Sequence, residues 1–261
     1  MPCSLIRGDQ RSDGAQYSII ECRSDNLVTA NYFLTVCETL IQILGTEPDI
    51  RALSSCVTRL ASIFQRLHAP PSRTVIGLFG ELFIIWRSSD PIETLSYWHE
   101  DLTSRFDFMS RNIRLEVKVT TRRVRVHTFS YDQCNPPTGT MPIVASMIVE
   151  RTDSGLSIQE MASDISARLG DRVDLLFKLQ TVIAETLGNQ MDEGMHEGFD
   201  KELAEHTLCF YDVSAIPAVR GDLELGVSEV HFSSDLSGCA ALSRSALIDV
   251  SDHWNHVLPP T

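Results

Sequence analysis

The sequence lacks three features, each of which would assign the chain to a class of protein. It has no C-x-x-C pair among its seven cysteines and no G-x-x-x-x-G-K-[ST] loop. It also has no uninterrupted run of about 18 apolar residues, the length that spans a membrane. An odd number of unpaired cysteines argues against a disulfide framework or a zinc ribbon, and favours a reducing, cytoplasmic setting. We therefore expect no membrane span, no secretory leader and no ATPase loop.

What is present is the composition of a globular protein with an acidic surface. Of the 261 residues, 43% are hydrophobic and 22% are charged, and the formal net charge is −13. Most of such a surface should repel polyanions, and a chain of this length forms one large domain or two small ones. We predict a helical N-terminal region at 1–69, a core at 70–188, and a C-terminal extension at 189–261 packed on the core.

Apolar periodicity predicts helices on both sides of residue 70. The stretch "VIGLFGELFIIWR", Val75–Arg87, is almost continuously apolar but contains Glu81, and Ser72 or Thr74 would cap its start. A buried carboxylate without a partner is costly, so Glu81 either has a partner or lies where the helix emerges at the surface. An earlier helix, 28–44, has a stripe that we expect to be buried, made of Val28, Leu34, Cys37, Leu40, Ile41 and Leu44.

Strand-like runs follow the apolar helix. "IRLEVKVTT" alternates, so Val117 and Val119 should face one side of a sheet, and Glu116 and Lys118 the other. "RFDFM" and "RVHTFS" flank this run, and "IVASMIVE" is apolar enough for a buried strand. Ser157 begins the capping box "SIQE", which predicts a further helix.

The chemically informative residues lie in "DFMSRNIRLEVK". A hairpin here can bring Asp107 beside Glu116, and two adjacent carboxylates repel one another unless a cation lies between them. A hard divalent cation with oxygen ligands, most naturally Mg²⁺, resolves that conflict. The ammonium of Lys118 would then lie next to the metal, where it can orient a water toward phosphorus. The alternative is a solvated strand face with a simple pair of opposite charges.

These residues resemble a known superfamily. Asp107 followed by Glu116-Val117-Lys118, with a helical glutamate before them, resembles the pattern of the PD-(D/E)XK phosphodiesterases, which include restriction enzymes, repair nucleases and resolvases. A bare D…ExK spacing often arises by chance. The chain also resembles an uncharacterised bacterial family assigned to this superfamily, from about residue 28 to 241, in "GLFGELFIIWR", "FDF", "LEVKVTT", "HTFSYDQ" and "FYDVSAIP…GVSEVHFSSDLS".

The resemblance implies an α/β, restriction-endonuclease-like fold: a mixed sheet flanked by helices, with a helical N-terminal region and a β-containing C-terminal extension. It implies a Mg²⁺-dependent endonuclease that hydrolyses phosphodiester bonds of DNA, with Mn²⁺ as a substitute, in bacterial restriction-modification or phage defence. In such systems a subunit of this kind acts with an ATPase or helicase, or with a methyltransferase, and a homodimer is one possible assembly.

The resemblance also implies residue roles. Asp107 and Glu116 would be metal ligands, the carbonyl of Val117 would complete the coordination, and Lys118 would be the water-positioning base. Glu81 would bind the metal directly or support a ligand that does. Gln133 has either a role beside the site or only that of a turn-capping amide.

The first core helix of this superfamily packs across the sheet. Gly77, Gly80 and Glu81 share one helical face, and the two glycines would allow a close approach to the sheet. The sequence departs from the superfamily pattern at two places outside the candidate metal ligands. Phe106 stands where the superfamily name has proline. Only "YDQCNPPTG" separates the third and fourth strands, where the superfamily usually has a helix.

A basic island surrounds the candidate site. Between residues 105 and 125 there are seven basic residues against two acidic ones, whereas the rest of the chain has 15 basic and 33 acidic residues. Such an island predicts that a phosphodiester backbone docks there. Alternatively, the island faces the chain's own acidic segment "MDEGMHEGFDKELAE". The DNA-binding candidates are Arg105, Arg111, Arg114, Arg122, Arg123 and Arg125, beside Lys118.

Two other function classes stay open at this point. The chain could be a non-catalytic DNA-binding or scaffold subunit that retains the nuclease fold. It could also be an acidic interaction module whose basic island docks another protein.

Overall fold

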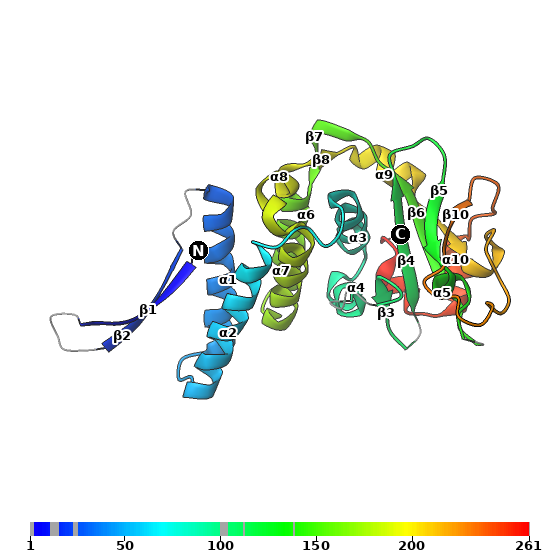
Figure 1. Ribbon diagram of the computed structural model, residues 1–261. Helices are drawn as coiled ribbons and strands as arrows, with labels where there is room; N and C mark the ends of the chain where they lie inside the picture. Colours follow the sequence, from blue (N-terminus) through cyan, green and yellow to red (C-terminus); the bar gives the residue numbers. More distant parts are fainter. Residues whose placement is uncertain are drawn as a thin grey trace. The chain divides into compact units, whose positions relative to one another are not determined.

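The computed structural model describes residues 3–10, 16–22, 26–99, 104–111, 113–137 and 139–260. The chain divides into two compact units, one of residues up to 72 with 171–194, the other of 73–170 with 195–261. Figure 1 colours the chain along its sequence. The sequence prediction places the helix near 171–187 in the core, but in the structure this helix packs with the N-terminal helices.

The first unit combines a strand hairpin with three packed helices. The hairpin pairs β1 (Cys3–Gln10) with β2 (Gln16–Cys22) in antiparallel fashion. The helices are α1 (Leu27–Leu44), α2 (Ile50–Arg66) and α7 (Val173–Leu187), and each contacts the other two. Asn26 and Asp49 cap α1 and α2 through their side-chain oxygens, which accept orphan backbone N–H groups.

The buried stripe of α1 differs from the predicted one. Leu34 and Ile41 are 61% and 66% exposed, so their predicted burial is wrong. The reason is that the aromatic residues of α1 define the face that packs in the unit, and this face is rotated from the aliphatic stripe. The buried side chains are Tyr32, Phe33, Val36, Thr39 and Leu40.

Helix α1 is also the one described helix that is long and apolar enough, by length and composition, to cross a membrane. Its 18-residue window has a mean hydropathy of 1.4, and 28% of that window is buried. A search for unbroken apolar runs misses this helix because Asn31, Glu38 and Gln42 interrupt it. Core helices of soluble proteins and signal sequences pass the same test, so the finding is weak evidence for a span.

The second unit is a mixed α/β fold around a four-stranded sheet of order β3-β4-β6-β9. Strands β4 and β6 are parallel, and the outer pairs are antiparallel. The strands are β3 (Phe108–Met109), β4 (Arg114–Thr120), β6 (Ile143–Ile148) and β9 (Cys209–Asp212). The last of these comes from the C-terminal extension, so the extension completes the sheet.

The connection from β4 to β6 explains the missing superfamily helix. Strand β5 (Val126–Ser130) leaves the main sheet and pairs antiparallel with β10 (His231–Asp235) in a separate two-stranded sheet. A helix of one turn, α5 (Tyr131–Cys134), then leads to β6. Parallel strands need a long crossover, and here a strand and a single turn provide it. "IVASMIVE" therefore contains the strand that pairs in parallel with β4.

Helices and short strands complete the second unit. Ser157 and Glu160 form the predicted capping box at the start of α6. The acidic segment after Gly188 contains helices α8 and α9. The other helices and strands of this unit are α3 (Val75–Arg87), α4 (Pro91–Tyr97), β7 (Arg151–Ser157), α6 (Ile158–Leu169), β8 (Gly198–Phe199), α9 (Lys201–Thr207), α10 (Arg244–Val250) and α11 (Trp254–Val257). Helix α8 (Met191–His196) spans the boundary between the two units.

The two faces of β4 have different neighbours. Helix α3, capped by Thr74, packs where Gly80 meets Val117 and Val119. A Cβ on Gly80 would lie 2.2 Å from the Cγ2 of Val119, so glycine is required for this close packing. Gly77 has no such contact with the sheet, so its predicted role is wrong. The opposite face is covered by a cluster that includes Phe129 of β5 and Val144 of β6.

This packing predicts that Gly80→Ala destabilises the protein. Overpacking of a rigid core costs roughly 1–3 kcal/mol, whereas alanine gains about 1 kcal/mol of helix propensity over glycine. We expect a net loss of up to about 2 kcal/mol in the free energy of unfolding, measured by denaturant titration. Gly77→Ala is the matched control, because its Cβ would meet only the Oγ1 of Thr74, at 3.2 Å. Equal stability of the two variants would contradict the packing described.

Candidate active site

Glu81 is buried where α3 crosses β4. Its side chain is 5% exposed, and both carboxylate oxygens accept hydrogen bonds. The Nε1 of Trp98 donates to Oε2 at 2.7 Å, and the Nη1 of Arg73 donates to Oε1 at 2.9 Å. The alternative of a surface glutamate is therefore wrong, and the carboxylate inside the apolar helix has partners.

Arg73 joins Glu81 to Asp107. The same Nη1 atom lies 3.2 Å from the Oδ1 of Asp107, and the arginine side chain is 25% exposed. Arg73 immediately precedes Thr74, the N-cap of α3, so the turn that begins the helix also places this guanidinium. One cation thus offsets part of the charge of two carboxylates.

Asp107 lies at the edge of the sheet, just before β3. The N–H of Val117 donates to its Oδ2 at 2.8 Å, and the N–H of His99 donates to its main-chain carbonyl at 2.9 Å. Since the N–H and C=O groups of one strand residue point to the same edge, the carbonyl of Val117 also faces this edge. Pairing of Phe108 with Leu115 sets the register that brings Asp107 to β4.

Glu116 and Lys118 form a close ion pair on the other face of β4. The Nζ of Lys118 lies 2.6 Å from the Oε1 of Glu116, and it lies 5.2 Å from the ring centroid of Phe129. The side chain of Gln133 also hydrogen-bonds to Glu116. Glu116 is only 6% exposed, so the alternative of a solvated strand face is wrong.

Burial and mutual repulsion raise the pKa values of the three carboxyl groups. Burial, followed by the charge of Asp107, raises the pKa of Glu81 to about 8 and that of Glu116 to about 7. Burial also raises the pKa of Asp107, despite the opposing effects of Val117, Lys118 and Arg73. Asp107 is therefore the common neighbour of the two glutamates, and the ionised site carries more negative charge than its cations offset.

The three carboxylates do not converge on one point. In the described part of the chain, no group of three or more His, Cys, Asp or Glu side chains is arranged to hold a metal ion. Glu81 approaches from the α3 face of β4, Glu116 projects from the opposite face, and Asp107 lies at the edge. The donors still suit a divalent cation in kind, because they are hard oxygen ligands with uncompensated negative charge.

A cavity of about 670 Å³ opens beside Lys118 and provides access to this face. The lining residues are all of polar or charged types, and they come from β4, the second sheet, the turn before β3 and helix α5. A cavity with convergent polar groups next to carboxyl groups of raised pKa is a typical candidate site. The lining residues are Ser104, Arg105, Lys118, Thr128, Ser130, Asp132, Gln133 and His231.

The arginines of the basic island fall into two groups. Arg105 lines the cavity, and Arg105, Arg111 and Arg122 are exposed. Arg123 is exposed but pairs with Glu150 at 2.9 Å. The guanidinium of Arg105 at the cavity and the other exposed arginines of the island suit a phosphodiester backbone.

Two further arginines are bound within the protein. Arg125 donates to the carbonyls of Ser146 and Thr207, which uses its guanidinium to join β6 to the end of α9. Arg114 is half-buried and lies 3.5 Å from the carbonyl of Ser110.

Three residues of the site were not assigned a definite role from the sequence. Arg73 and Trp98 hold Glu81, and no local pattern marks either of them as a partner. Gln133 caps α5 reciprocally with Ser130, so its capping role is confirmed. It also reaches Glu116, and a role beside the site stays a prediction. The available signal for Arg73 was a basic residue directly before the N-cap of the helix that carries Glu81.

Comparison with protein families gives one match. Residues 4–237 match a family model described as "Putative PD-(D/E)XK family member, (DUF4420)". Comparisons with curated proteins and with solved structures found no match. The match spans the strand hairpin, the carboxylate site and β10, and so includes every residue of the site described above. The chain therefore belongs to the DUF4420 family, a family assigned to the PD-(D/E)XK group.

Proposed function

We propose that this protein is a metal-dependent nuclease that hydrolyses phosphodiester bonds of DNA on a restriction-endonuclease-like core. The observation that carries the proposal is the placement of Asp107 against β4. Pairing of β3 with β4 brings its carboxylate within hydrogen-bond distance of Val117, between Glu81 and the Glu116–Lys118 pair. Residues far apart in the sequence thus form one buried, charged site next to a polar cavity. Most PD-(D/E)XK proteins are nucleases that use divalent metal.

In the proposed reaction, each group of the site has a separate role. Asp107, Glu116 and the carbonyl of Val117 would hold Mg²⁺ or Mn²⁺, which would act as a Lewis acid toward the phosphate. Lys118 lies at the cavity wall, where its Nζ can orient a water for attack on phosphorus. Trp98 holds Glu81, and Glu81 in turn holds Arg73 beside Asp107. Glu81 would therefore support the metal ligand Asp107 through Arg73, without binding the metal itself.

A non-catalytic DNA-binding or scaffold role is the second candidate. Two observations favour it: Arg73 already bridges Glu81 and Asp107, and the described carboxylates form no three-residue metal group. Binding of DNA is common to both candidates, and cleavage separates them. In either case we propose a bacterial restriction or phage-defence setting with an ATPase, helicase or methyltransferase as partner.

DNA binding is tested by its salt dependence in a chelator, where cleavage cannot interfere. Each phosphate neutralised contributes about 0.9 to the slope of log affinity against log salt for duplex DNA. We expect replacement of Arg105, Arg111 and Arg122 by Gln to reduce this slope by up to about 2.7. Arg151→Gln is the control, because Arg151 already pairs with Glu197.

The two outcomes of this titration are distinct. A flatter slope in the triple variant, with the control unchanged, supports docking of DNA at the cavity. An unchanged slope would mean that these arginines do not contact DNA phosphates, and would contradict the proposal that DNA docks here.

A further inference from the structure

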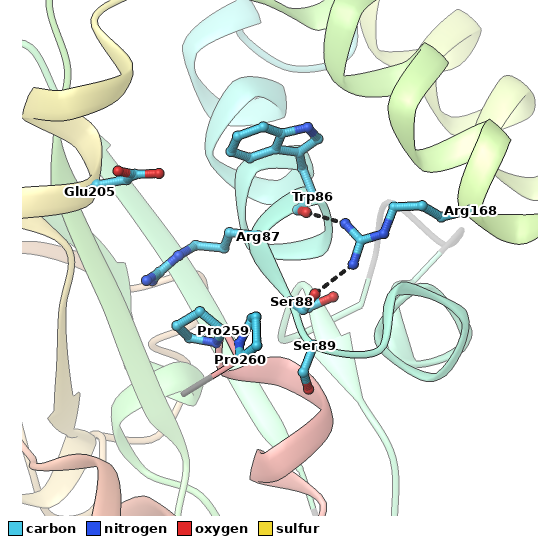
Figure 2. A pocket seen from close by; sticks show the side chains of 8 residues that line it. All are labelled: Trp86, Arg87, Ser88, Ser89, Arg168, Glu205, Pro259 and Pro260. Carbon is cyan, nitrogen blue, oxygen red and sulfur yellow. Dashed lines mark hydrogen bonds between the residues drawn. The ribbon is translucent and has the colours of Figure 1, made fainter.

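A second cavity of the same unit lies away from the carboxylate site and has a different chemistry. It has a volume of about 490 Å³ and lies at the C-terminal end of α3. Figure 2 shows that Arg87 extends into it from α3, toward the side where Glu205 and the two prolines lie. None of its lining residues belongs to the carboxylate site. They are Trp86, Arg87, Ser88, Ser89, Arg168, Glu205, Pro259 and Pro260.

The guanidinium of Arg87 has no hydrogen bond or ion pair with any described residue. It is half-buried, and its one described ring contact is with Phe83, whose centroid lies 6.0 Å away. Glu205 lines the same cavity but forms its ion pair with Lys201, at 3.8 Å. Burial lowers the pKa of Arg87, the charge of Glu205 opposes this shift, and the charge of Arg244 adds to it. A half-buried guanidinium that makes no hydrogen bond to a described residue is costly, so a ligand that supplies negative charge would be stabilised here.

The other charged groups around the cavity add to the positive potential. Arg168 donates to the carbonyls of Trp86 and Ser88, as Figure 2 shows, and so occupies the exposed carbonyls at the end of α3. Arg244 donates to the carbonyl of Pro259 at 2.7 Å. Lys201 lies 4.9 Å above the ring of Trp86.

Basic groups outnumber acidic ones at this site. Arg87 and Arg168 line the cavity together with Glu205. Lys201, Arg244 and Asp164 contact lining residues, which gives four basic groups and two carboxylates in all. This local excess occurs in a chain of net charge −13. A concentration of guanidinium groups against the overall charge is typical of a site that binds an anion.

We propose that this cavity is a phosphate-binding pocket and that Arg87 is its principal ligand. Guanidinium groups bind phosphate oxygens through parallel hydrogen bonds, and a phosphate carries more charge than a carboxylate. The excess of two basic groups therefore matches the charge of a phosphate better than that of a carboxylate. The phosphate could be free or part of a nucleotide, or it could belong to a DNA backbone, and the experiment distinguishes these sources.

The first measurement is a thermal melt with inorganic phosphate in the presence of a chelator. Phosphate should raise the melting temperature of the wild type, because a ligand that binds only the folded state stabilises it. Arg87→Gln should lose this response while melting at the same or a higher temperature without phosphate, since it removes an unpaired cation. Arg151→Gln, which alters an exposed arginine paired with Glu197, should respond as the wild type does.

The second measurement is calorimetric titration with inorganic phosphate, with acetate, and with short duplex DNA, all without metal. If the source is free phosphate, Arg87→Gln should bind phosphate roughly tenfold or more weakly, the loss expected for a charged hydrogen bond. If the source is a DNA backbone, the same loss should appear with DNA alone. A response to acetate but not to phosphate or DNA would overturn the proposal, as would unchanged affinities in Arg87→Gln. Neither result depends on whether the carboxylate site binds metal or cleaves DNA.

Discussion

Lys118→Ala should reduce Mg²⁺-dependent cleavage of DNA by roughly 10²–10⁴-fold, the range for loss of a positioned general base. The ammonium lies 2.6 Å from Glu116 and lines the cavity where substrate would enter. The measurement is single-turnover cleavage of a supercoiled plasmid, because turnover can be limited by product release.

The controls for this experiment separate catalysis from folding. Asp107→Asn keeps the size of the side chain and an oxygen that can accept from Val117, so it should fold and also lose cleavage. Losses in the two variants should not add, because the residues act as a unit. Lys178→Ala, which changes a half-buried lysine of α7, should cleave as the wild type does. Cleavage at the wild-type rate by Lys118→Ala would remove the assignment of this lysine.

Local patterns in the sequence predicted the parts of the site that depend on local geometry. Strand alternation identified the separate faces of Glu116 and Val117, and helical spacing placed Gly80 and Glu81 together. The capping boxes at Ser157 and Ser130 were predictable because cap residues lie within one turn of their partners. These features depend on neighbours a few residues away, which a single sequence can indicate.

The parts that the sequence did not predict depend on distant contacts. Arg73 donates a hydrogen bond to Asp107, which lies 34 residues later in the sequence. This contact depends on the pairing of β3 with β4, which positions Asp107. The departure of β5 from the main sheet likewise depends on β10, which lies a hundred residues later. In α1, tertiary packing selected the aromatic face over the aliphatic stripe, so periodicity alone named the wrong side.

Glu116→Gln should stabilise the metal-free protein at neutral pH. The pKa of Glu116 is raised to about 7 by burial and by Asp107, which shows that the fold disfavours its charged form. The neutral amide keeps the shape and can still accept from Lys118. The main opposing cost is the loss of charge from the pair with that lysine, and the upward shift shows that this pair does not compensate for burial.

The pH dependence follows from the same shift. The pKa of Glu116 is higher in the folded state than in the unfolded state. Between these two pKa values the native state therefore binds more protons than the unfolded state does. The free energy of unfolding of the wild type should therefore be highest below the unfolded pKa and fall as the pH rises through about 7, with Glu81 extending the fall toward about 8. Glu116→Gln should show a smaller fall in this window.

The most direct test of the metal site is the melting temperature of the wild type and of Glu116→Gln, in chelator and in saturating Mn²⁺. A divalent cation that binds only the folded state should stabilise the wild type by about 2.7 kcal/mol at a hundredfold excess over its dissociation constant. We predict a clear rise for the wild type at neutral pH and little or none for Glu116→Gln, which lacks one of the two carboxylate ligands. An unchanged wild-type melting temperature in saturating Mn²⁺ would contradict the claim that Asp107 and Glu116 form a metal site.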